Sequence, residues 1–134
     1  MTIKVGINGF GRIGRLCLRA AWDWADIEFV QINDPAGDAE THAHLLNYDS
    51  VHGRWEPQAE ANGNTIVVGH KTIALTANKA IDDTDWSACD VVIEASGKMR
   101  DTGLLQSYLD QGVKRVVVTA PIKQPGILNV VMGV

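Results

Sequence analysis

The sequence lacks the features that mark secreted, membrane-spanning or nucleic-acid-binding proteins. Its two cysteines, Cys17 and Cys89, stand too far apart for a metal-binding motif, so we expect free thiols in a reducing cytosol. No apolar run approaches the roughly 20 residues that cross a bilayer, and the N-terminus turns polar and glycine-rich too early for a signal peptide. The formal net charge of −4 disfavours nucleic acid as a partner. These absences predict a cytoplasmic protein with no membrane or nucleic-acid partner.

What remains is the composition of one ordinary globular domain. The 134 residues are 46% hydrophobic and 21% charged, and they contain no repeats or low-complexity tracts. A chain of this length can bury a sizeable core. The acidic residues Asp82, Asp83 and Asp85 are typical of a solvated helix start, so no metal site is predicted. We therefore expect a single domain over residues 1–134.

Apolar runs and helical patterns alternate along most of the chain. Strands are predicted at 3–7, 29–32, 90–94, 115–119 and 128–132. Helices are predicted at 11–24, at 38–47 with Asp38 as cap, and at 101–111 with Gly112 as C-cap, and a short helical turn at 84–86. Residues 55–77, with turns at 62–64 and 69–70, predict an antiparallel ribbon. The order predicts an α/β fold, a doubly wound parallel (Rossmann) sheet with an inserted antiparallel ribbon.

The first predicted helix carries its apolar residues at helical spacing. We expect this face to pack on the sheet and the thiol of Cys17 to fill the core. The face consists of Ile13, Leu16, Cys17, Ala20, Ala21 and Trp24.

The strongest local motif is Gly9-Phe10-Gly11-Arg12-Ile13-Gly14, which follows a predicted strand and opens a predicted helix. Gly9 permits a tight turn, Gly11 lets the backbone approach a pyrophosphate, and Gly14 lets the helix pack closely. The helix N-terminus offers N–H groups to the anion. Asp34 follows the next strand, where a carboxylate binds the ribose hydroxyls and repels a 2′-phosphate. The pattern predicts NAD as cofactor.

Two further segments fall just after predicted strands, at the same edge of the sheet. Ala95-Ser96-Gly97 and Thr119-Ala120-Pro121 offer small and hydroxyl side chains to a ligand there. Taken alone, each of them could equally be an ordinary turn. The glycine motif also has an alternative, a plain turn with Asp34 as a loop cap, but the strand before it, the helix after it and the position of Asp34 favour the dinucleotide site over that turn.

Several blocks together resemble the glyceraldehyde-3-phosphate dehydrogenase family. The likeness begins in residues 5–15 and continues through Ile32-Asn33-Asp34, residues 44–53, Glu94-Ala95-Ser96-Gly97, Thr119-Ala120-Pro121 and residues 129–134, all in family order. The resemblance implies an N-terminal NAD-binding domain. It also implies the cofactor-binding residues Asn8, Gly9, Phe10, Gly11, Arg12, Ile13, Gly14, Asp34, Lys79, Ser96, Gly97 and Thr119.

The sequence departs from the family pattern at a few of these positions. Asn78-Lys79-Ala80-Ile81 replaces the common Glu-Arg-Asp-Pro, so Lys79 takes the place of a planar arginine near the adenine. Ala95 replaces the first serine of Ser-Thr-Gly, and Thr119 replaces a serine. Residues 35–38 resemble a bacterial side branch of the family, whose members are linked to arsenate handling or to erythrose 4-phosphate.

The resemblance implies a glycolytic oxidoreductase that works as a cytoplasmic homotetramer. Such an enzyme oxidises a small phosphorylated aldehyde through a cysteine thioester and passes a hydride to NAD. No Ser-Cys-Thr-Thr-Asn-like sequence occurs here, so we expect the catalytic domain to be absent and the chain alone to be inactive. A non-catalytic nucleotide-binding or interaction module is the alternative.

The other candidate residues have bland interpretations. Cys89 precedes a buried strand at the edge opposite the cofactor, which predicts an inert thiol. His42, His44 and His70 fit helix-surface or turn positions, and His52 fits a structural or intersubunit role. The tryptophans are expected to pack in the core or at interfaces.

Overall fold

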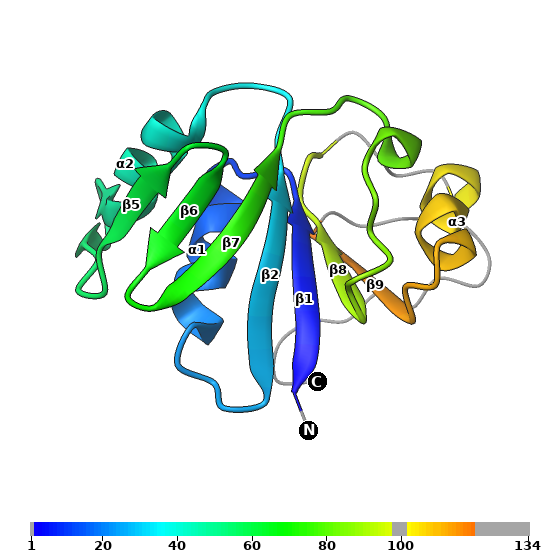
Figure 1. Cartoon of the computed structure of the whole chain (residues 1–134), viewed down its shortest axis with the longest axis horizontal. Helices are drawn as coiled ribbons and strands as arrows, with labels where there is room; N and C mark the ends of the chain where they lie inside the picture. Colours follow the sequence, from blue (N-terminus) through cyan, green and yellow to red (C-terminus); the bar gives the residue numbers. More distant parts are fainter. Residues whose placement is uncertain (1, 98–101, 120–134) are drawn as a thin grey trace.

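The computed structural model describes residues 2–97 and 102–119 (Figure 1), and of residues 102–104 only the backbone. Within these residues a seven-stranded sheet has the order β5-β6-β7-β2-β1-β8-β9, and β3 and β4 form a separate two-stranded sheet. The elements are β1 (Ile3–Asn8), α1 (Arg12–Ala21), β2 (Ile27–Asn33), α2 (Ala39–Asn47), β3 (Tyr48–Asp49), β4 (Gly53–Arg54), β5 (Ala59–Asn62), β6 (Thr65–Val68), β7 (Lys71–Thr76), the 3₁₀ turn η1 (Ile81–Asp83), β8 (Val91–Glu94), α3 (Thr102–Asp110) and β9 (Arg115–Val118).

The central strands run parallel and the strand order reverses at β1. Strand β1 pairs in parallel with β2 on one side and with β8 on the other, and β9 continues beyond β8. Strands β5, β6 and β7 form the predicted antiparallel ribbon, and β7 joins it to the main sheet by pairing in parallel with β2. The doubly wound sheet with an inserted ribbon is therefore confirmed.

Each face of the sheet carries its own core, because alternate residues of a strand point to opposite faces. In Figure 1, α1 is seen behind β6 and β7, and α3 lies beside β9 at the far end of the sheet. The first core contains Val5, Ile7, Leu18, Ile32 and Leu46, among others. The second core consists of Ile81, Trp86, Cys89, Val92, Leu105, Tyr108 and Val113.

Helix α1 turns a different face to the sheet from the one that its apolar residues predict. Its buried residues are Gly14 and Leu18, whereas Ile13 is 55% exposed. A Cβ on Gly14 would lie 2.2 Å from the carbonyl oxygen of Gly9, so this side of the helix makes the closest approach. That approach turns Ile13 outward. The predicted apolar face is therefore wrong in part: Ala21 packs against the first core, whereas Ala20 and Trp24 are exposed. The helix ends at Ala21, before the predicted end at Trp24.

The predicted caps and turns are largely confirmed. The carboxylate of Asp38 accepts a hydrogen bond from the backbone N–H of Thr41 at 2.8 Å, which caps α2. Gly63 and Gly69 have positive φ in the two turns of the ribbon, where glycine is unstrained. Gly112 likewise has φ +100° after α3.

Two predictions about local structure have other outcomes. The helical turn expected at 84–86 is wrong, because the 3₁₀ turn η1 forms at Ile81–Asp83 instead. The strand expected at 128–132 lies outside the described residues.

Among the residues that the structure describes, no helix is long and apolar enough to cross a membrane.

Candidate functional site

The carboxyl ends of four neighbouring strands bring the predicted site segments to one edge of the sheet. The glycine motif follows β1, Asp34 follows β2, Ser96 follows β8 and Thr119 follows β9. Backbone hydrogen bonds tie these ends together: the N–H of Gly9 donates to the oxygen of Asn33 at 2.7 Å. The N–H of Ala95 donates to the oxygen of Asn8, also at 2.7 Å. The four segments thus lie in the order β2, β1, β8, β9 along the edge.

The three glycines of the motif meet different surroundings. Gly9 has φ +96°, and a Cβ there would lie 2.5 Å from the backbone nitrogen of Ser96. At Gly14 a Cβ would collide with the carbonyl oxygen of Gly9. A Cβ on Gly11 would instead meet nothing within 4 Å among the described residues. Gly9 and Gly14 therefore serve internal packing, whereas Gly11 opens onto the space where a ligand can approach.

The N-terminus of α1 is suited to an anion. Its N-cap is Gly11, which makes no side-chain cap bond, and its first turn contains no acidic residue. The first N–H groups of a helix lack intrahelical partners and carry the positive end of the helix dipole. The Arg12 side chain lies beside this turn and bonds through Nε to Oδ1 of Asp49 at 3.2 Å. The pKa of Asp49 is lowered by the backbone N–H of His52 and then by Arg12.

The carboxylate of Asp34 is fixed by two backbone donors. Its Oδ2 accepts from the N–H of Phe10 at 2.7 Å, and its Oδ1 accepts from the N–H of Ala36 at 2.8 Å. The residue is half-buried, so its carboxylate is oriented and still accessible. A fixed carboxylate at the end of β2, beside an uncapped helix N-terminus and an open Gly11, fits the ribose and pyrophosphate of a dinucleotide.

His42 is buried beneath the loop after Asp34 and holds that loop by a hydrogen bond. The prediction that it is a helix-surface residue is therefore wrong. His42 is only 4% exposed, and its Nε2 donates to the carbonyl oxygen of Ala36 at 2.8 Å. Its ring packs edge-on against buried Phe10, with 5.7 Å between the ring centroids. The sequence pattern misassigned His42 because the loop that covers it is contributed from outside α2.

A row of buried polar side chains crosses the ends of β2, β1 and β8. Asn33, Asn8 and Glu94 are register partners on these strands, and each is at most 4% exposed. Nδ2 of Asn33 donates to Oδ1 of Asn8 at 2.9 Å, and Nδ2 of Asn8 donates to Oε2 of Glu94 at 2.9 Å. We call these three residues, together with Tyr108 of α3, the polar ladder.

Glu94 is the most densely bonded member of the polar ladder. Its Oε2 accepts from Asn8 and from the hydroxyl of Tyr108, and its Oε1 accepts from the backbone N–H and the hydroxyl of Ser96. Burial raises the pKa of Tyr108, and the nearby charge of Glu94 raises it further. The Tyr108 hydroxyl therefore keeps its proton and donates it to Glu94.

Sequence reasoning assigned no role to Asn33, Glu94 or Tyr108. The available signal was that β1, β2 and β8 are largely apolar strands and that each ends in an amide or carboxylate side chain. Buried polar groups need partners, so three such ends at one edge predict a shared hydrogen-bond network.

The remaining predicted residues lie on the exposed side of this edge. Gly97 is exposed with φ +76°. Thr119 is exposed and its N–H donates to the carbonyl oxygen of Glu94 at 3.1 Å. Lys79 is exposed on the loop after β7, next to Asn78, whose carbonyl oxygen accepts from Nδ2 of Asn33 at 2.9 Å. The structure brings the first two to the ends of β8 and β9, and it places Lys79 on the loop after β7, beside the end of β2.

The two thiols do not belong to this edge. Cys89 is 2% exposed, and burial, followed by the charges of Asp90 and Asp85, raises its pKa to about 11. The burial on which the expectation of an inert thiol at Cys89 rests is confirmed. Cys17 is half-buried rather than a full core residue, and burial raises its pKa as well. Thiols with raised pKa values are poor nucleophiles at neutral pH.

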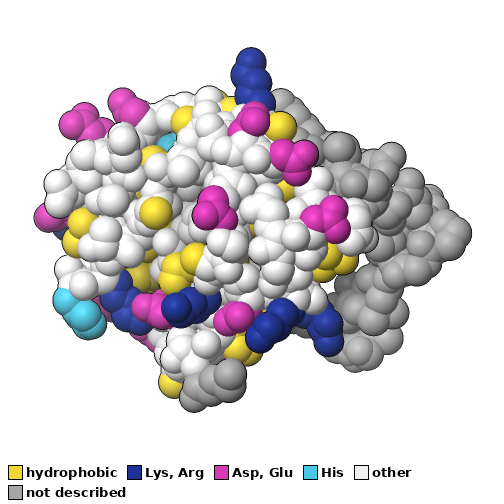
Figure 2. Space-filling view, turned by 45° about the vertical axis from the view of Figure 1, so that its right-hand side comes forward, with side chains coloured by type: hydrophobic (Ala, Val, Ile, Leu, Met, Phe, Trp, Pro, Cys, Tyr) yellow, Lys and Arg dark blue, Asp and Glu magenta, His cyan; other side chains and the backbone are white. Residues whose placement is uncertain are grey.

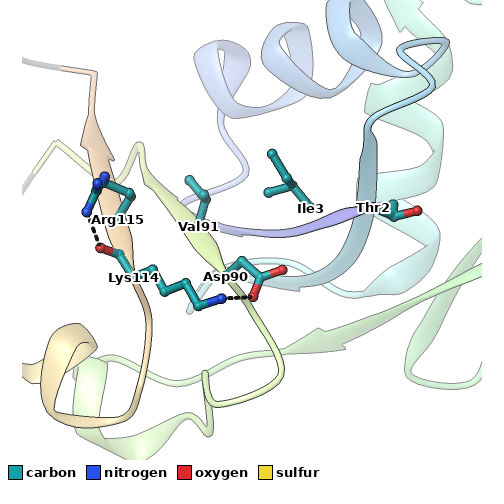
Figure 3. A pocket seen from close by; sticks show the side chains of 6 residues that line it. All are labelled: Thr2, Ile3, Asp90, Val91, Lys114 and Arg115. Atoms are coloured by element: carbon teal, nitrogen blue, oxygen red, sulfur yellow. Dashed lines mark hydrogen bonds and ion pairs between the residues drawn. The ribbon is translucent and has the colours of Figure 1, made fainter.

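A hollow of about 490 Å³ lies at the opposite, amino end of the parallel strands. Figure 3 shows its lining side chains, among them Ile3, Val91 and the ion pair of Lys114 with Asp90, whose Nζ and Oδ1 lie 3.7 Å apart. Ligands of open α/β sheets bind beyond the carboxyl ends of the strands. The hollow is therefore separate from the candidate cofactor site.

Comparison with known proteins gives a consistent picture. The family described as "Glyceraldehyde 3-phosphate dehydrogenase, NAD binding domain" matches residues 3–102. The chain is 48% identical over 136 aligned positions to glyceraldehyde-3-phosphate dehydrogenase 3 of Nostoc sp., and 45% identical over 136 positions to the enzyme of Geobacillus stearothermophilus. Each alignment covers 100% of this chain and 40% of the relative. A relative from Trypanosoma brucei brucei, named as cytosolic, is 43% identical over 92% of this chain and 38% of its own length. The chain thus spans about 40% of the length of these relatives.

Proposed function

This chain belongs to the glyceraldehyde-3-phosphate dehydrogenase family, within its NAD-binding domain, and from that premise we propose that the segments after β1, β2, β8 and β9 hold one NAD molecule. Residues 1–134 would form this single domain. The proposed cofactor-binding residues are Asn8, Gly9, Phe10, Gly11, Arg12, Ile13, Gly14, Asp34, Lys79, Ser96, Gly97 and Thr119.

The fixed carboxylate of Asp34 is the observation that carries the proposal. Its two oxygens are oriented by Phe10 and Ala36, so the carboxylate is in place before a ribose arrives. Such preorganisation lowers the entropic cost of binding. The backbone at Gly11 and the N-terminus of α1 lie next along the edge, where the pyrophosphate would be held by N–H groups.

The order of the strand ends sets the direction of the cofactor. Adenosine at the end of β2 and the pyrophosphate at the end of β1 direct the second nucleoside towards β8 and β9. Ser96 and Thr119 would then face the nicotinamide half. Asn8 and Phe10 are buried, so they would contribute through their backbone or by supporting their neighbours. Bound NAD supplies the hydride acceptor of the reaction.

The whole protein, on this proposal, oxidises a small phosphorylated aldehyde through a cysteine thioester. Neither thiol of this chain suits that attack, because Cys89 is buried and the pKa values of both are raised. We therefore expect the chain alone to bind NAD without oxidising aldehydes. A homotetramer is proposed for the whole protein, and exposed Tyr48 and Val51 in the β3–β4 region offer apolar surface to a neighbour. The Trypanosoma relative supports a cytosolic location.

Isothermal titration calorimetry with NAD and NADP tests the proposal. The charge of Asp34 would lie close to a 2′-phosphate, and such a repulsion costs about 1 kcal/mol or more, so NAD should bind at least about tenfold more tightly. Asp34→Asn removes the charge and keeps an acceptor oxygen, so it should reduce the difference between the affinities for NAD and NADP. Equal affinities for both cofactors in the unsubstituted chain would contradict the ribose role. No heat with either cofactor at millimolar concentration would contradict the site itself.

A further inference from the structure

We propose that Glu94 and Tyr108 are positioning residues that hold the Ser96 segment in place for the nicotinamide half of the cofactor. The inference rests on the proposed NAD site and names the groups that shape one half of it. It follows from the polar ladder, whose side chains are buried beneath the segments that would touch the ligand.

The donors around Glu94 match an ionised carboxylate. Four protons point at its two oxygens, from Nδ2 of Asn8, the hydroxyl of Tyr108, and the N–H and hydroxyl of Ser96. A carboxylate is acceptor-only and offers two lone pairs on each oxygen, so all four donors are accommodated. Glu94 thus joins the end of β1, helix α3 and the segment after β8 through one side chain.

Ser96 is the half-buried member of this arrangement and belongs to the segment after β8 that the proposed site assigns to the nicotinamide half. Its N–H and its hydroxyl proton both go to Oε1 of Glu94, at 3.2 Å for the N–H. These two bonds fix the backbone and the side chain of Ser96 to one carboxylate oxygen. The segment also packs on the glycine motif, because a Cβ on Gly9 would lie 2.5 Å from the Ser96 nitrogen.

Tyr108 holds the other side of the carboxylate. It is fully buried, its ring packs edge-on against Trp86, and its hydroxyl accepts from Nδ2 of Asn8 at 2.8 Å while donating to Glu94. Tyr108→Phe keeps the ring and its packing and removes the hydroxyl alone. Oε2 of Glu94 then loses one of its two donors, and Asn8 loses an acceptor. The carboxylate becomes free to shift and carries Ser96 with it.

The test compares NAD with AMP, which contains the adenosine half only, by calorimetry on the full chain. Tyr108→Phe should lower the affinity for NAD about fivefold, since one hydrogen bond to a charged group is lost at the nicotinamide side. It should change the affinity for AMP by less than about twofold. Trp86→Phe is the matched control. It changes the ring that packs against Tyr108 but removes no hydrogen bond of the polar ladder, so the NAD-to-AMP affinity ratio should be unchanged.

An equal change for NAD and AMP in Tyr108→Phe, or no change in either, would overturn the inference and leave the proposed site intact. Failure of the unsubstituted chain to bind either nucleotide would count against the site instead. Should Tyr108→Phe not fold, Ser96→Ala provides the second variant, because it cuts the hydroxyl bond to Glu94 at the surface. It should lower the NAD-to-AMP ratio about threefold or more, and an unchanged ratio would likewise overturn the proposal.

Discussion

At their carboxyl ends, β2, β1 and β8 bury Asn33, Asn8 and Glu94 in a continuous hydrogen-bonded row, whereas the amino end of β1 is exposed and those of β2 and β8 are only half-buried. At the amino end Lys4 is exposed and Ile3 is 42% exposed. Figure 2 shows Lys and Arg side chains gathered along this lower rim of the molecule. Polar groups that are buried need particular partners, and exposed ones exchange partners with water. The side chains at the carboxyl end of the sheet therefore need particular neighbours, whereas substitutions at the amino end should have little effect on stability.

The largest effect should come from Gly9→Ala at the carboxyl end. Alanine would have to adopt the φ of +96° that Gly9 has, and its Cβ would lie 2.5 Å from the Ser96 nitrogen. Strain and overpacking together should lower the free energy of unfolding by about 3 kcal/mol or more. Urea denaturation measures this loss. Gly11→Ala is the control, because its Cβ has open space. It should cost about 1 kcal/mol or less while weakening NAD, and similar losses for both variants would contradict the packing role of Gly9.

Asn33→Ala should have the next largest effect. It removes the donor to Asn8 and Asn78 and the acceptor of the Thr76 hydroxyl at 2.6 Å, which leaves buried polar groups without a partner. We expect a loss of about 2–3 kcal/mol in the free energy of unfolding. Glu28→Ala, at the amino end of the same strand, should change it by less than about 0.5 kcal/mol. Comparable losses in the free energy of unfolding for Asn33→Ala and Glu28→Ala would contradict the difference between the two ends of the sheet.

Lys114→Ala tests the amino end of the sheet directly. Its ion pair with Asp90 spans 3.7 Å and is largely exposed, with 70% and 36% of the two side chains accessible. Exposed pairs contribute roughly 0–1 kcal/mol, so thermal unfolding of this variant should match that of the parent within a few degrees. A loss of stability as large as that of Asn33→Ala would show that the amino end also needs particular neighbours.

The smallest effect concerns acid. The backbone N–H of Lys4 donates to Oδ2 of Asp90 at 3.0 Å, and this bond, with help from the charge of Lys114, lowers the Asp90 pKa. A carboxylate whose folded pKa is below its unfolded value of about 3.9 stabilises the fold above that value. This stabilisation is lost as the pH falls through the folded pKa. The Lys4 amide proton should therefore titrate by NMR with a midpoint below about 3.9. A midpoint above this value would contradict the bond.

The elements that could be predicted from sequence depend on local chemistry. The Asp38 cap, the glycine turns of the ribbon and the glycine motif between β1 and α1 each involve residues within a few positions of one another. Their geometry follows from side-chain reach and from backbone φ. The order of strands and helices then sufficed to predict the parallel sheet.

The polar ladder escaped prediction because it depends on contacts across the chain, whereas the buried face of α1 and the burial of His42 depend on close backbone approaches that an apolar pattern does not record. Asn8 and Glu94 are 86 positions apart and Asn8 and Tyr108 are 100 apart, so no local pattern pairs them. The buried face of α1 is decided by the approach of Gly14 to Gly9, which overrides the count of apolar residues. His42 is buried by a loop that precedes its own helix. Of the candidate site, the positions of the ligand-facing segments could be predicted, and the buried support beneath them could not.

Because Cys89 is buried in the second core, the rate at which its thiol is alkylated can measure how often that core opens. The thiol is only 2% exposed, and a Cβ added to Gly6 would lie 2.7 Å from its sulfur, so the described residues cover it closely in the closed state. Alkylation at Cys89 then waits for the second core to separate, and its rate reports how often that happens. Cys17, half-buried on α1, reacts through smaller fluctuations. The ratio of the two labelling rates, with and without NAD, measures how far the ligand slows the motion of one face of the sheet relative to the other.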